Sequence, residues 1–542
     1  MSKITNYLNE HLVGDVVASD NTRRQYSTDG SVLSLMPSIV VHPRVTDDIR
    51  KMARFTWRLA ERGQILPLTM RGNGTSPTGA ALSKGIILSF PAHMAQIMEF
   101  DLKYRMVRVQ PGISLDALSQ AVATQGMRLP IDGGNSRMMT IGGALASNLP
   151  GRQYAKYGTI RDWVDKLEVV LANGEIIQTG RISRRELSAK KGLQTLEGEI
   201  YRSIDSLIED NPDVINNLAS ASSLDASVYP LDLVKEDNGS FDLTPLIIGS
   251  EGSLGIVTQV ILRLVDLPTD DAMIVAAVTD DENLSDLTNR LLELEPAALE
   301  FIDEGTLTLI NDITGYEPWS TFTNKLPHSL LFIEFDDKHA QRQLKRAVKI
   351  LESAGVTDAK IAADAGEIES VMTIYDSVAA ITNFSDKGFS AVPLLTDLAV
   401  PPETVLDLVD KIRAILKRNH VQAGVWGNLG SGLITIRPII NLANLGQRQV
   451  VFRLLDQISE LIEDVDGSLT GCNGTGRLLA PWTKKQHDKE TAEVMQAVKK
   501  IFDPYGILNT GCRNEEATRT DILATLRQNY DLDNFVQYNL RG

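Results

Sequence analysis

The chain has 542 residues, of which 43% are hydrophobic and 23% are charged. Its formal net charge of −16 gives it an acidic surface, which disfavours nucleic acid and tight binding to anionic lipid as partners. At about 100–200 residues per domain, the length requires two or three hydrophobic cores.

The first half of the chain mixes strands and helices. Apolar runs predict strands over 38–42, 65–70, 85–90, 105–110 and 256–265. Capping residues predict helices that begin at Thr46 and Ser114 and end near Gly63 and Gly126. Asn173-Gly174 is predicted as the two-residue turn of a hairpin over 164–180. The polar segment 181–245 is predicted to form loop and helix.

A domain boundary is predicted near Pro268, where a polar stretch interrupts the apolar runs. Strands beyond it are predicted over 272–278, 298–303 and 330–335, and helices over 283–294, 338–354, 403–418 and 447–463. Strand, helix and strand in this order indicate a second α+β domain. The tail is predicted to hold one long helix, 483–503. The expected domains are therefore 1–268, 269–476 and a C-terminal segment, 477–542.

Cysteine content and hydropathy narrow the class of protein further. The two cysteines are too few for an iron–sulfur cluster or a cysteine-based zinc site, and such sparse use is typical of a reducing compartment. The N-terminus lacks an apolar export signal, and no run of 18 apolar residues predicts a transmembrane helix. We therefore expect a cytoplasmic protein.

Glycine-rich stretches are the strongest local signals. In RGNGTSPTG (71–79), two glycines free the backbone to turn, so that consecutive N–H groups can converge on an anion beside the charge of Arg71. An ordinary surface turn is the alternative. The stretch is not a Rossmann fingerprint, because the third glycine of that motif would fall on Pro77.

Two further stretches have the same character. In the stretch 132–148, Thr140 can cap a helix whose first turns are small residues, so that a large ligand could lie against free N–H groups. Close packing of helix and sheet is the alternative. The stretch 248–257 is glycine-rich and precedes a buried strand. Three such loops without an in-line catalytic residue indicate one wrapped cofactor rather than three sites.

These stretches carry a family resemblance. RGNGTSPTG, TIGGALASN, YGTIRDWVDKLEVVLANGEII and IIGSEGSLGIVTQVILRL resemble, in order and spacing, the FAD-binding domain of the vanillyl-alcohol oxidase (p-cresol methylhydroxylase) type. DPYGILNTG (503–511) resembles the C-terminal signature of that family. DLAVPPETV (397–405) and GVWGNLGSGL (424–433) resemble the cap of D-lactate dehydrogenases and glycolate oxidase flavin subunits. The implied fold is α+β: a two-subdomain FAD-binding domain, an α+β cap and a tail that returns to the first domain.

The resemblance implies roles for the loops. Residues 72–76 would bind the pyrophosphate, 140–148 would line the dinucleotide, 251–257 would face the adenosine or flavin, and Asn509 would lie near the isoalloxazine. The expected FAD-binding residues are Arg71, Gly72, Asn73, Gly74, Thr75, Ser76, Gly79, Asp132, Gly133, Thr140, Ile141, Gly142, Gly143, Ala146, Ser147, Asn148, Glu251, Gly252, Gly255, Ile256, Val257 and Asn509. Residues 71–79 contain no histidine, so the flavin is expected to be non-covalent, with His93 as the nearest exception to check.

The cap motifs depart from those of the relatives. Where the relatives have G-H-x-G-D-G-N-x-H, this chain has Asn428 and Thr435 at the histidine positions. Where they have G-E-H-G-I-G, it has Cys472 and Asn473 in place of Glu and His. Their metal ligands are therefore missing while every glycine is kept, and we expect no catalytic metal.

The side chains expected to face the substrate are Tyr375, Thr382, Asn428, Thr435, Arg437 and Asn473. For Arg437 the alternatives are a carboxylate anchor and a solvated strand residue. The resemblance implies an FAD-dependent oxidoreductase that transfers hydride from a small alcohol, such as a 2-hydroxy acid, to flavin N5. Electrons would pass on to a carrier protein, a quinone or oxygen. The alternatives are a flavin-binding subunit with little chemistry of its own and an oxidase of another alcohol on this fold.

Overall fold

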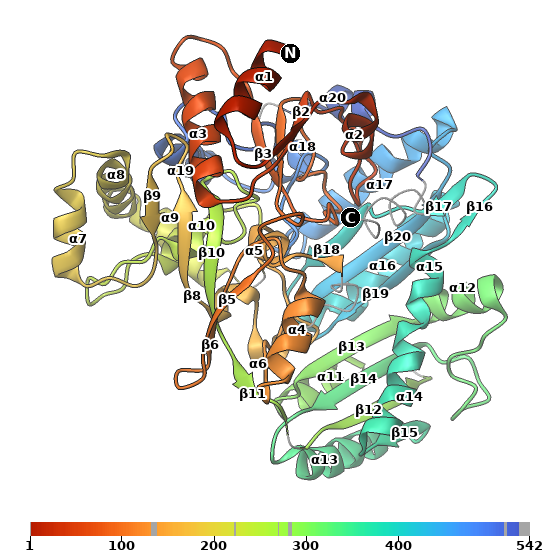
Figure 1. Cartoon of the computed structure of the whole chain (residues 1–542). Helices are drawn as coiled ribbons and strands as arrows, with labels where there is room; N and C mark the ends of the chain where they lie inside the picture. Colours follow the sequence, from red (N-terminus) through yellow and green to blue (C-terminus); the bar gives the residue numbers. More distant parts are fainter. Residues whose placement is uncertain are drawn as a thin grey trace.

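A computed structural model describes residues 2–131, 138–221, 224–268, 270–279, 284–513 and 517–530. Within the described residues, the N-terminal domain, up to residue 268, holds two larger sheets and a two-stranded one, and the cap, residues 270–476, holds a nine-stranded sheet (Figure 1). The tail then runs back to the N-terminal domain. Within the described ranges, none of the helices is both long and apolar enough to cross a bilayer.

The first sheet of the N-terminal domain has the strand order β1-β2-β4-β3. Its strands are β1 Asp15–Val17, β2 Ile39–His42, β3 Leu68–Arg71 and β4 Ile86–Ser89. Its helices are α1 Ser2–His11, α2 Asp20–Gln25 and α3 Thr46–Ala60. Because β2, β4 and β3 are parallel, the loop after β3 leaves from the carboxyl edge of the sheet. Ligands of parallel sheets commonly bind at that edge.

The second sheet is antiparallel, in the order β5-β6-β10-β8-β9. Its strands are β5 Ile97–Asp101, β6 Met106–Val109, β8 Val164–Val170, β9 Ile176–Gln178 and β10 Ile256–Arg263, with β7 Met127–Arg128 and β11 Val265–Asp266 paired beside it. The helices of this part are α4 Leu115–Ala123, α5 Ile141–Ser147, α6 Tyr154–Tyr157, α7 Arg184–Lys191, α8 Leu196–Asp210, α9 Pro212–Ser220 and α10 Thr244–Ile247. Buried residues of α5, among them Ile141 and Leu145, share one core with this sheet.

The cap contains a large antiparallel sheet in the order β15-β12-β14-β13-β19-β20-β17-β16, and β18 also pairs with β20. Its strands are β12 Ala272–Val278, β13 Ala298–Asp303, β14 Ser329–Phe335, β15 Ala359–Ala362, β16 Ser385–Asp386, β17 Phe389–Ala391, β18 Leu395–Ala399, β19 Ala423–Asn428 and β20 Leu433–Ile440. Its helices are α11 Leu284–Leu292, α12 Glu304–Thr314, α13 Ala340–Ser353, α14 Ala365–Tyr375, α15 Ala379–Thr382, α16 Val405–Arg418 and α17 Leu445–Glu463.

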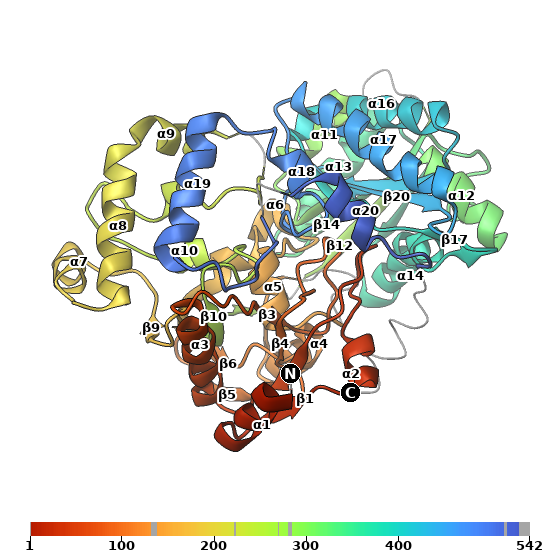
Figure 2. The ribbon, with the colours of Figure 1, turned by 90° about the horizontal axis from the view of Figure 1, so that it is seen from above.

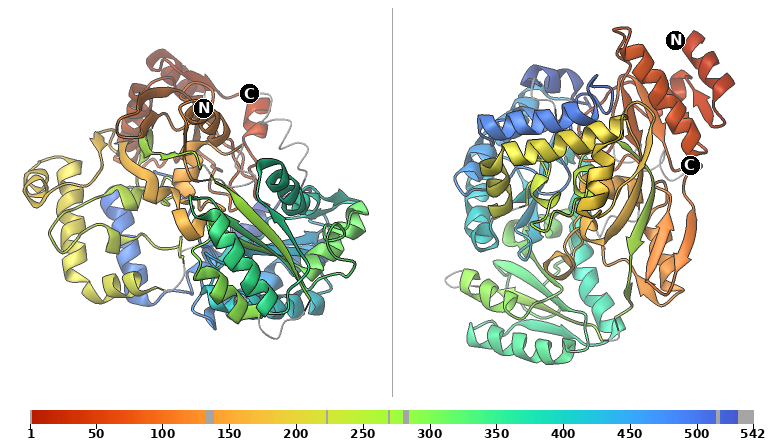
Figure 3. Two further views of the ribbon diagram at one scale, coloured as in Figure 1. Left: turned by 90° about the horizontal axis from the view of Figure 1, so that it is seen from below. Right: turned by 90° about the vertical axis from the view of Figure 1, so that its left-hand side faces the viewer.

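Helices cover both faces of the cap sheet (Figure 3). Side chains of α11, α13, α16 and α17 share a core with one face, and side chains of α12, α14 and α15 share a core with the other. Strands buried on both faces are continuously apolar rather than alternating, which explains the sequences of β12 and β14. An acidic residue inside such a strand, such as Glu300 in β13, therefore stands out.

The tail contains α18 Ala480–Thr483, α19 Lys489–Phe502 and α20 Arg519–Thr525. Helix α19 lies beside α8 of the N-terminal domain (Figure 2). After α19, Leu508 bridges Leu68 of β3 in parallel, and two main-chain hydrogen bonds fasten Leu68 to Ile507 and Asn509. The tail thereby extends the sheet from which the first glycine-rich loop leaves.

Some predicted elements were wrong in detail. The hairpin of β8 and β9 does not have the predicted two-residue turn. The amide of Leu171 donates to the carbonyl of Glu175, so three residues form the turn, and one of them, Gly174, has a φ of 85°. The tail helix predicted over 483–503 is two helices, because α18 ends at Thr483 and α19 starts at Lys489. Thr46 is not the cap of α3 but its first residue.

Replacing Asp503 by alanine should destabilise the protein by about 3–5 kcal/mol, because a buried charge would lose its partner. The Asp503 carboxylate is fully buried and accepts hydrogen bonds from Lys499, Ile507 and Leu508. Denaturant titration measures the effect. As the control, Glu493→Ala removes only an exposed pair with Lys489 on the same helix and should cost about 0.5 kcal/mol or less. Equal losses in the two variants would contradict the prediction.

Candidate functional site

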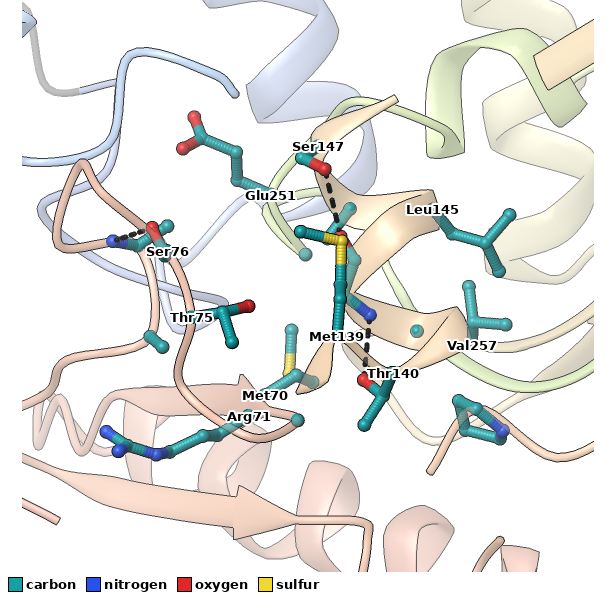
Figure 4. A pocket seen from close by; sticks show the side chains of 18 of the residues that line it. Met70, Arg71, Thr75, Ser76, Met139, Thr140, Leu145, Ser147, Glu251 and Val257 are labelled. Atoms are coloured by element: carbon teal, nitrogen blue, oxygen red, sulfur yellow. Dashed lines mark hydrogen bonds between the residues drawn. The ribbon is translucent and has the colours of Figure 1, made fainter. Parts of the chain in front are cut away.

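A cavity of about 990 Å³ is lined by all three glycine-rich stretches, which lie far apart in the sequence (Figure 4). The lining residues that the sequence predicted are Arg71, Gly72, Asn73, Gly74, Thr75, Ser76, Thr140, Gly142, Gly143, Ala146, Ser147, Glu251, Gly252, Gly255 and Val257. From the cap, Asn473 joins them.

The loop after β3 offers unused hydrogen-bond donors to this cavity. Within the part of the chain that the structure describes, the main-chain N–H groups of residues 72–76 donate to no protein acceptor. The loop is held from its other side: Gly30 donates its N–H to the Gly74 carbonyl, and the Asn73 side chain donates to the Met138 carbonyl. Consecutive free amides in a partly buried loop fit an anionic group such as a diphosphate.

Arg71 lines the cavity, but its side-chain hydrogen bonds are made to the N-terminal segment. Its guanidinium donates to the Thr28 carbonyl at 2.8 Å and lies over the Tyr26 ring. Figure 4 shows the side chain extending away from Met139 and Thr140. Burial lowers the pKa of this guanidinium, and Asp29 opposes that shift. Arg71 therefore supports the loop from behind.

Helix α5 contributes small residues rather than free amides. Thr140 caps it as predicted, with its hydroxyl accepting from Gly143 at 3.1 Å. The amides of Ile141 and Gly142, however, donate to Ile113 and Pro111, so the expected free N–H groups are already used. Gly72 lies so close to α5 that a Cβ there would overlap Oγ1 of Thr140. A ligand in the cavity can thus approach the helix backbone closely.

Several expected cofactor residues lie behind the cavity wall. Gly79, Ile141, Asn148, Ile256 and Asn509 are not among its lining residues. The Asn509 side chain instead donates to the carbonyls of Ala80 and Glu251, so it ties loops together. Asp132 and Gly133 lie outside the described residues.

The glutamate of the third stretch lines the cavity but holds another loop in place. The carboxylate of Glu251 accepts from the Gly476 amide at 2.8 Å and from Arg513 at 3.2 Å. Burial raises its pKa, and Arg513 opposes that shift. Pro77, Met139, Leu145 and Ser250 also line the cavity and belong to the three stretches, whereas the remaining lining residues lie outside them: Met70, Ala80, Ala81, Phe90, Pro111 and Ile247.

The expected substrate-facing residues divide into two groups. Asn473 lines the cavity, and its side chain lies 3.4 Å from the hydroxyl of Thr396. The other five are not among its lining residues, and the polar groups of four of them are bonded inside the protein. Tyr375 donates to Glu300, Thr382 to Ala379, Asn428 to the Arg152 carbonyl and Thr435 to the Thr396 carbonyl.

Arg437 is half-buried on β20. Burial lowers the pKa of its guanidinium, and Tyr530 opposes that shift. Among the described residues, its Nε has no hydrogen-bond partner.

The structure also shows how the replaced cap motifs are held. The buried carboxylate of Asp397 accepts the main-chain amides of Cys472 at 2.8 Å and Asn473 at 2.6 Å. Gly432, at φ 72°, packs against the Val400 carbonyl, where a Cβ would not fit. The described residues contain no group of three or more His, Cys, Asp or Glu placed to hold a metal ion.

The sequence matches two family models. Residues 37–180 match the FAD binding domain, and residues 267–512 match the C-terminal domain of FAD linked oxidases. Together the two ranges span most of the chain, including the loop after β3, helix α5, the cap and most of the tail.

Named relatives support the same assignment. The chain is 27% identical to a glycolate oxidase subunit of Bacillus subtilis, with 94% of each chain covered. It is 25% identical to a D-2-hydroxyglutarate dehydrogenase of Haemophilus influenzae over 93% of this chain and 50% of that protein. The chain thus spans about half the length of the D-2-hydroxyglutarate dehydrogenases that it matches.

Solved structures confirm the predicted fold. A 4-ethylphenol oxidase from Gulosibacter chungangensis superposes with a TM-score of 0.67 at 16% identity, covering 96% of this chain and 98% of that one. p-Cresol methylhydroxylase gives a TM-score of 0.67 at 12% identity, covering 94% and 96%. The architecture is that of the vanillyl-alcohol oxidase type. With both of its characteristic domains present in sequence and in fold, the chain belongs to the FAD-linked oxidase family.

Proposed function

We propose that this chain is an FAD-dependent dehydrogenase of small 2-hydroxy acids that works without a metal ion. One observation carries the proposal: Asn473, on the cap loop 471–476, lines the same cavity as the free amides of the loop after β3. Cofactor and substrate spaces would therefore meet at Asn473. The hydroxy-acid relatives support the substrate class.

In this proposal, residues 72–76 donate main-chain hydrogen bonds to the FAD diphosphate, and α5 gives the dinucleotide a flat surface of small residues. The cavity lining contains no His, Cys or Tyr side chain that could bond covalently to a flavin. His93 pairs with Asp15 at 2.6 Å outside the cavity. The cofactor is therefore proposed to be non-covalent.

Bound FAD would supply the hydride acceptor for the carbon that carries the substrate hydroxyl. The cap would orient the substrate through neutral side chains, chiefly Asn473. Arg437 would offer a cation without an acidic partner among the described residues, which suits a carboxylate. In this proposal, an electron-acceptor protein or a quinone takes the electrons from the flavin, and the protein is cytoplasmic. The two buried free cysteines fit a reducing compartment.

A second candidate is a flavin-binding subunit with little chemistry of its own. It is favoured by the internal hydrogen bonds of Tyr375, Asn428 and Thr435, which leave these groups already satisfied. A subunit of this kind would exchange electrons only with a protein partner.

Anaerobic mixing with a panel of D-2-hydroxy acids separates the two candidates. A dehydrogenase is expected to bleach the flavin absorbance with at least one of them, because the substrate supplies two electrons. Reduction by dithionite alone, with no hydroxy acid active, would refute the proposal and support the subunit.

Gly72→Ala should weaken FAD binding at least about tenfold, equal to about 1.4 kcal/mol. The added methyl group would displace the Thr140 hydroxyl that caps α5. Fluorescence titration with FAD measures the effect. Gly366→Ala is the control, since a Cβ there meets only Asp364 Oδ1, at 3.5 Å, and should leave the affinity unchanged. Unchanged affinity in Gly72→Ala would contradict the role of the loop.

Acid precipitation should leave the yellow colour in the supernatant, because a non-covalent flavin is released when the protein unfolds. Overnight dialysis against EDTA should leave the rate of flavin reduction unchanged, since the described residues form no metal-binding cluster. A yellow pellet would show a covalent flavin, and loss of rate that zinc or manganese restores would show a metal.

A further inference from the structure

The cap presents buried acidic residues to the N-terminal domain. Glu300 of β13 and Glu334 of β14 both meet the guanidinium of Arg152, at 3.5 Å and 2.5 Å. Just after β14, Asp336 accepts from Lys156 at 2.6 Å. Arg152 and Lys156 both belong to the segment after α5, so these ion pairs join the FAD-binding domain to the cap.

Glu300 and Asp336 respond differently to this contact. Burial disfavours the charge of Asp336, but hydrogen bonds from Lys156 and Tyr157 overcome it and lower the pKa of the carboxyl. Glu300 is 4% exposed, accepts a hydrogen bond from Tyr375 at 2.7 Å and shares Arg152 with Glu334. Burial therefore raises the pKa of Glu300 to about 7, opposed by Arg152 and Tyr375 and reinforced by the charge of Glu334.

We propose that Glu300 is a titrating positioning residue whose charge sets how Arg152 holds the segment after α5 against the cap. When Glu300 is ionised, Arg152 lies between two carboxylates. When Glu300 is protonated, the attraction between Arg152 and Glu300 is lost and that between Arg152 and Glu334 remains. The proton exchanges with solvent, and no bond is made or broken. Asp271, whose pKa is itself raised by burial and by Glu334, is the next acidic group beyond this cluster.

Short connections link this cluster to the flavin site, and in this respect the inference rests on the proposed function. The main-chain carbonyl of Arg152 accepts the side chain of Asn428 at 2.8 Å. Four residues separate Arg152 from Ser147, the last residue of α5, which lines the cavity. A shift of Arg152 toward Glu334 would therefore act on the wall of the cofactor site and on the cap turn together.

The test follows thermal unfolding of the FAD-loaded protein from about pH 5 to about pH 9 in the wild type and Glu300→Gln. A carboxyl whose folded pKa lies above its unfolded value costs stability as pH rises from the unfolded pKa through the folded one. The two proteins should therefore unfold at similar temperatures near pH 5. Above about pH 7, Glu300→Gln should unfold at the higher temperature. A difference that does not change with pH would overturn the proposal.

Ligand affinity gives an independent readout. The wild type should bind FAD about fivefold more weakly near pH 6 than near pH 8, and Glu300→Gln should lose this dependence. Asp337→Asn, which removes a more exposed carboxylate beside Lys156, should behave as the wild type. Tyr375→Phe keeps the carboxyl of Glu300 but removes its hydrogen-bond donor. The midpoint of the change in FAD affinity with pH should therefore move to higher pH. An unmoved midpoint, or wild-type affinity that is flat with pH, would refute the inference.

These outcomes separate the inference from the proposed function. Bleaching by a hydroxy acid without any pH midpoint would overturn the role of Glu300 alone. A midpoint that Glu300→Gln removes, in a protein that no hydroxy acid reduces, would support the role of Glu300 and refute the dehydrogenase.

Discussion

In the described part of the chain, the main-chain amides of residues 72–76 have no protein acceptor, and this run of donors is the constraint on which the loop after β3 depends. Free N–H groups in a partly buried loop are costly unless a ligand satisfies them, so the loop must be kept open by contacts elsewhere. Arg71, Asn73 and Gly30 provide these contacts through hydrogen bonds to other parts of the chain. The tail adds to this support by fastening Leu68, at the start of β3. Donors that are rigid before binding lose little entropy when a ligand arrives.

Elements that follow from local pattern were predictable from the sequence. The alternation of β10 and the cap of α5 by Thr140 depend on residues close together in the chain. What the sequence could not show was where polar groups of these elements find their partners. The amides of α5 bond to Pro111 and Ile113, and Asn509 bonds to Ala80 and Glu251, across long stretches of chain. Fifteen of the expected cofactor residues nevertheless line one cavity, because glycines permit the tight turns and close backbone approaches that such loops need.

The cap shows the same division between local and distant effects. A glutamate inside the apolar strand ALEFID is visible in the sequence as an anomaly, because a strand buried on both faces rarely carries a charge. The pKa of this glutamate could not be predicted from the sequence, because it depends on Arg152 and Tyr375, which come from separate parts of the chain. The same holds for the expected substrate-facing set: a motif position fixes the strand on which a side chain lies, but its hydrogen-bond partner comes from tertiary packing.

Asp397 has a consequence for how this family can change. Its carboxylate accepts hydrogen bonds from two peptide N–H groups of loop 471–476. These bonds do not depend on which side chains the loop carries. Gly432 likewise fits the neighbouring turn by main-chain contact alone. In this part of the cap, the contacts that hold the loop are therefore independent of the side chains that the loop carries. Mutations can therefore replace the side chains of loop 471–476 one at a time while the backbone of the loop keeps its conformation.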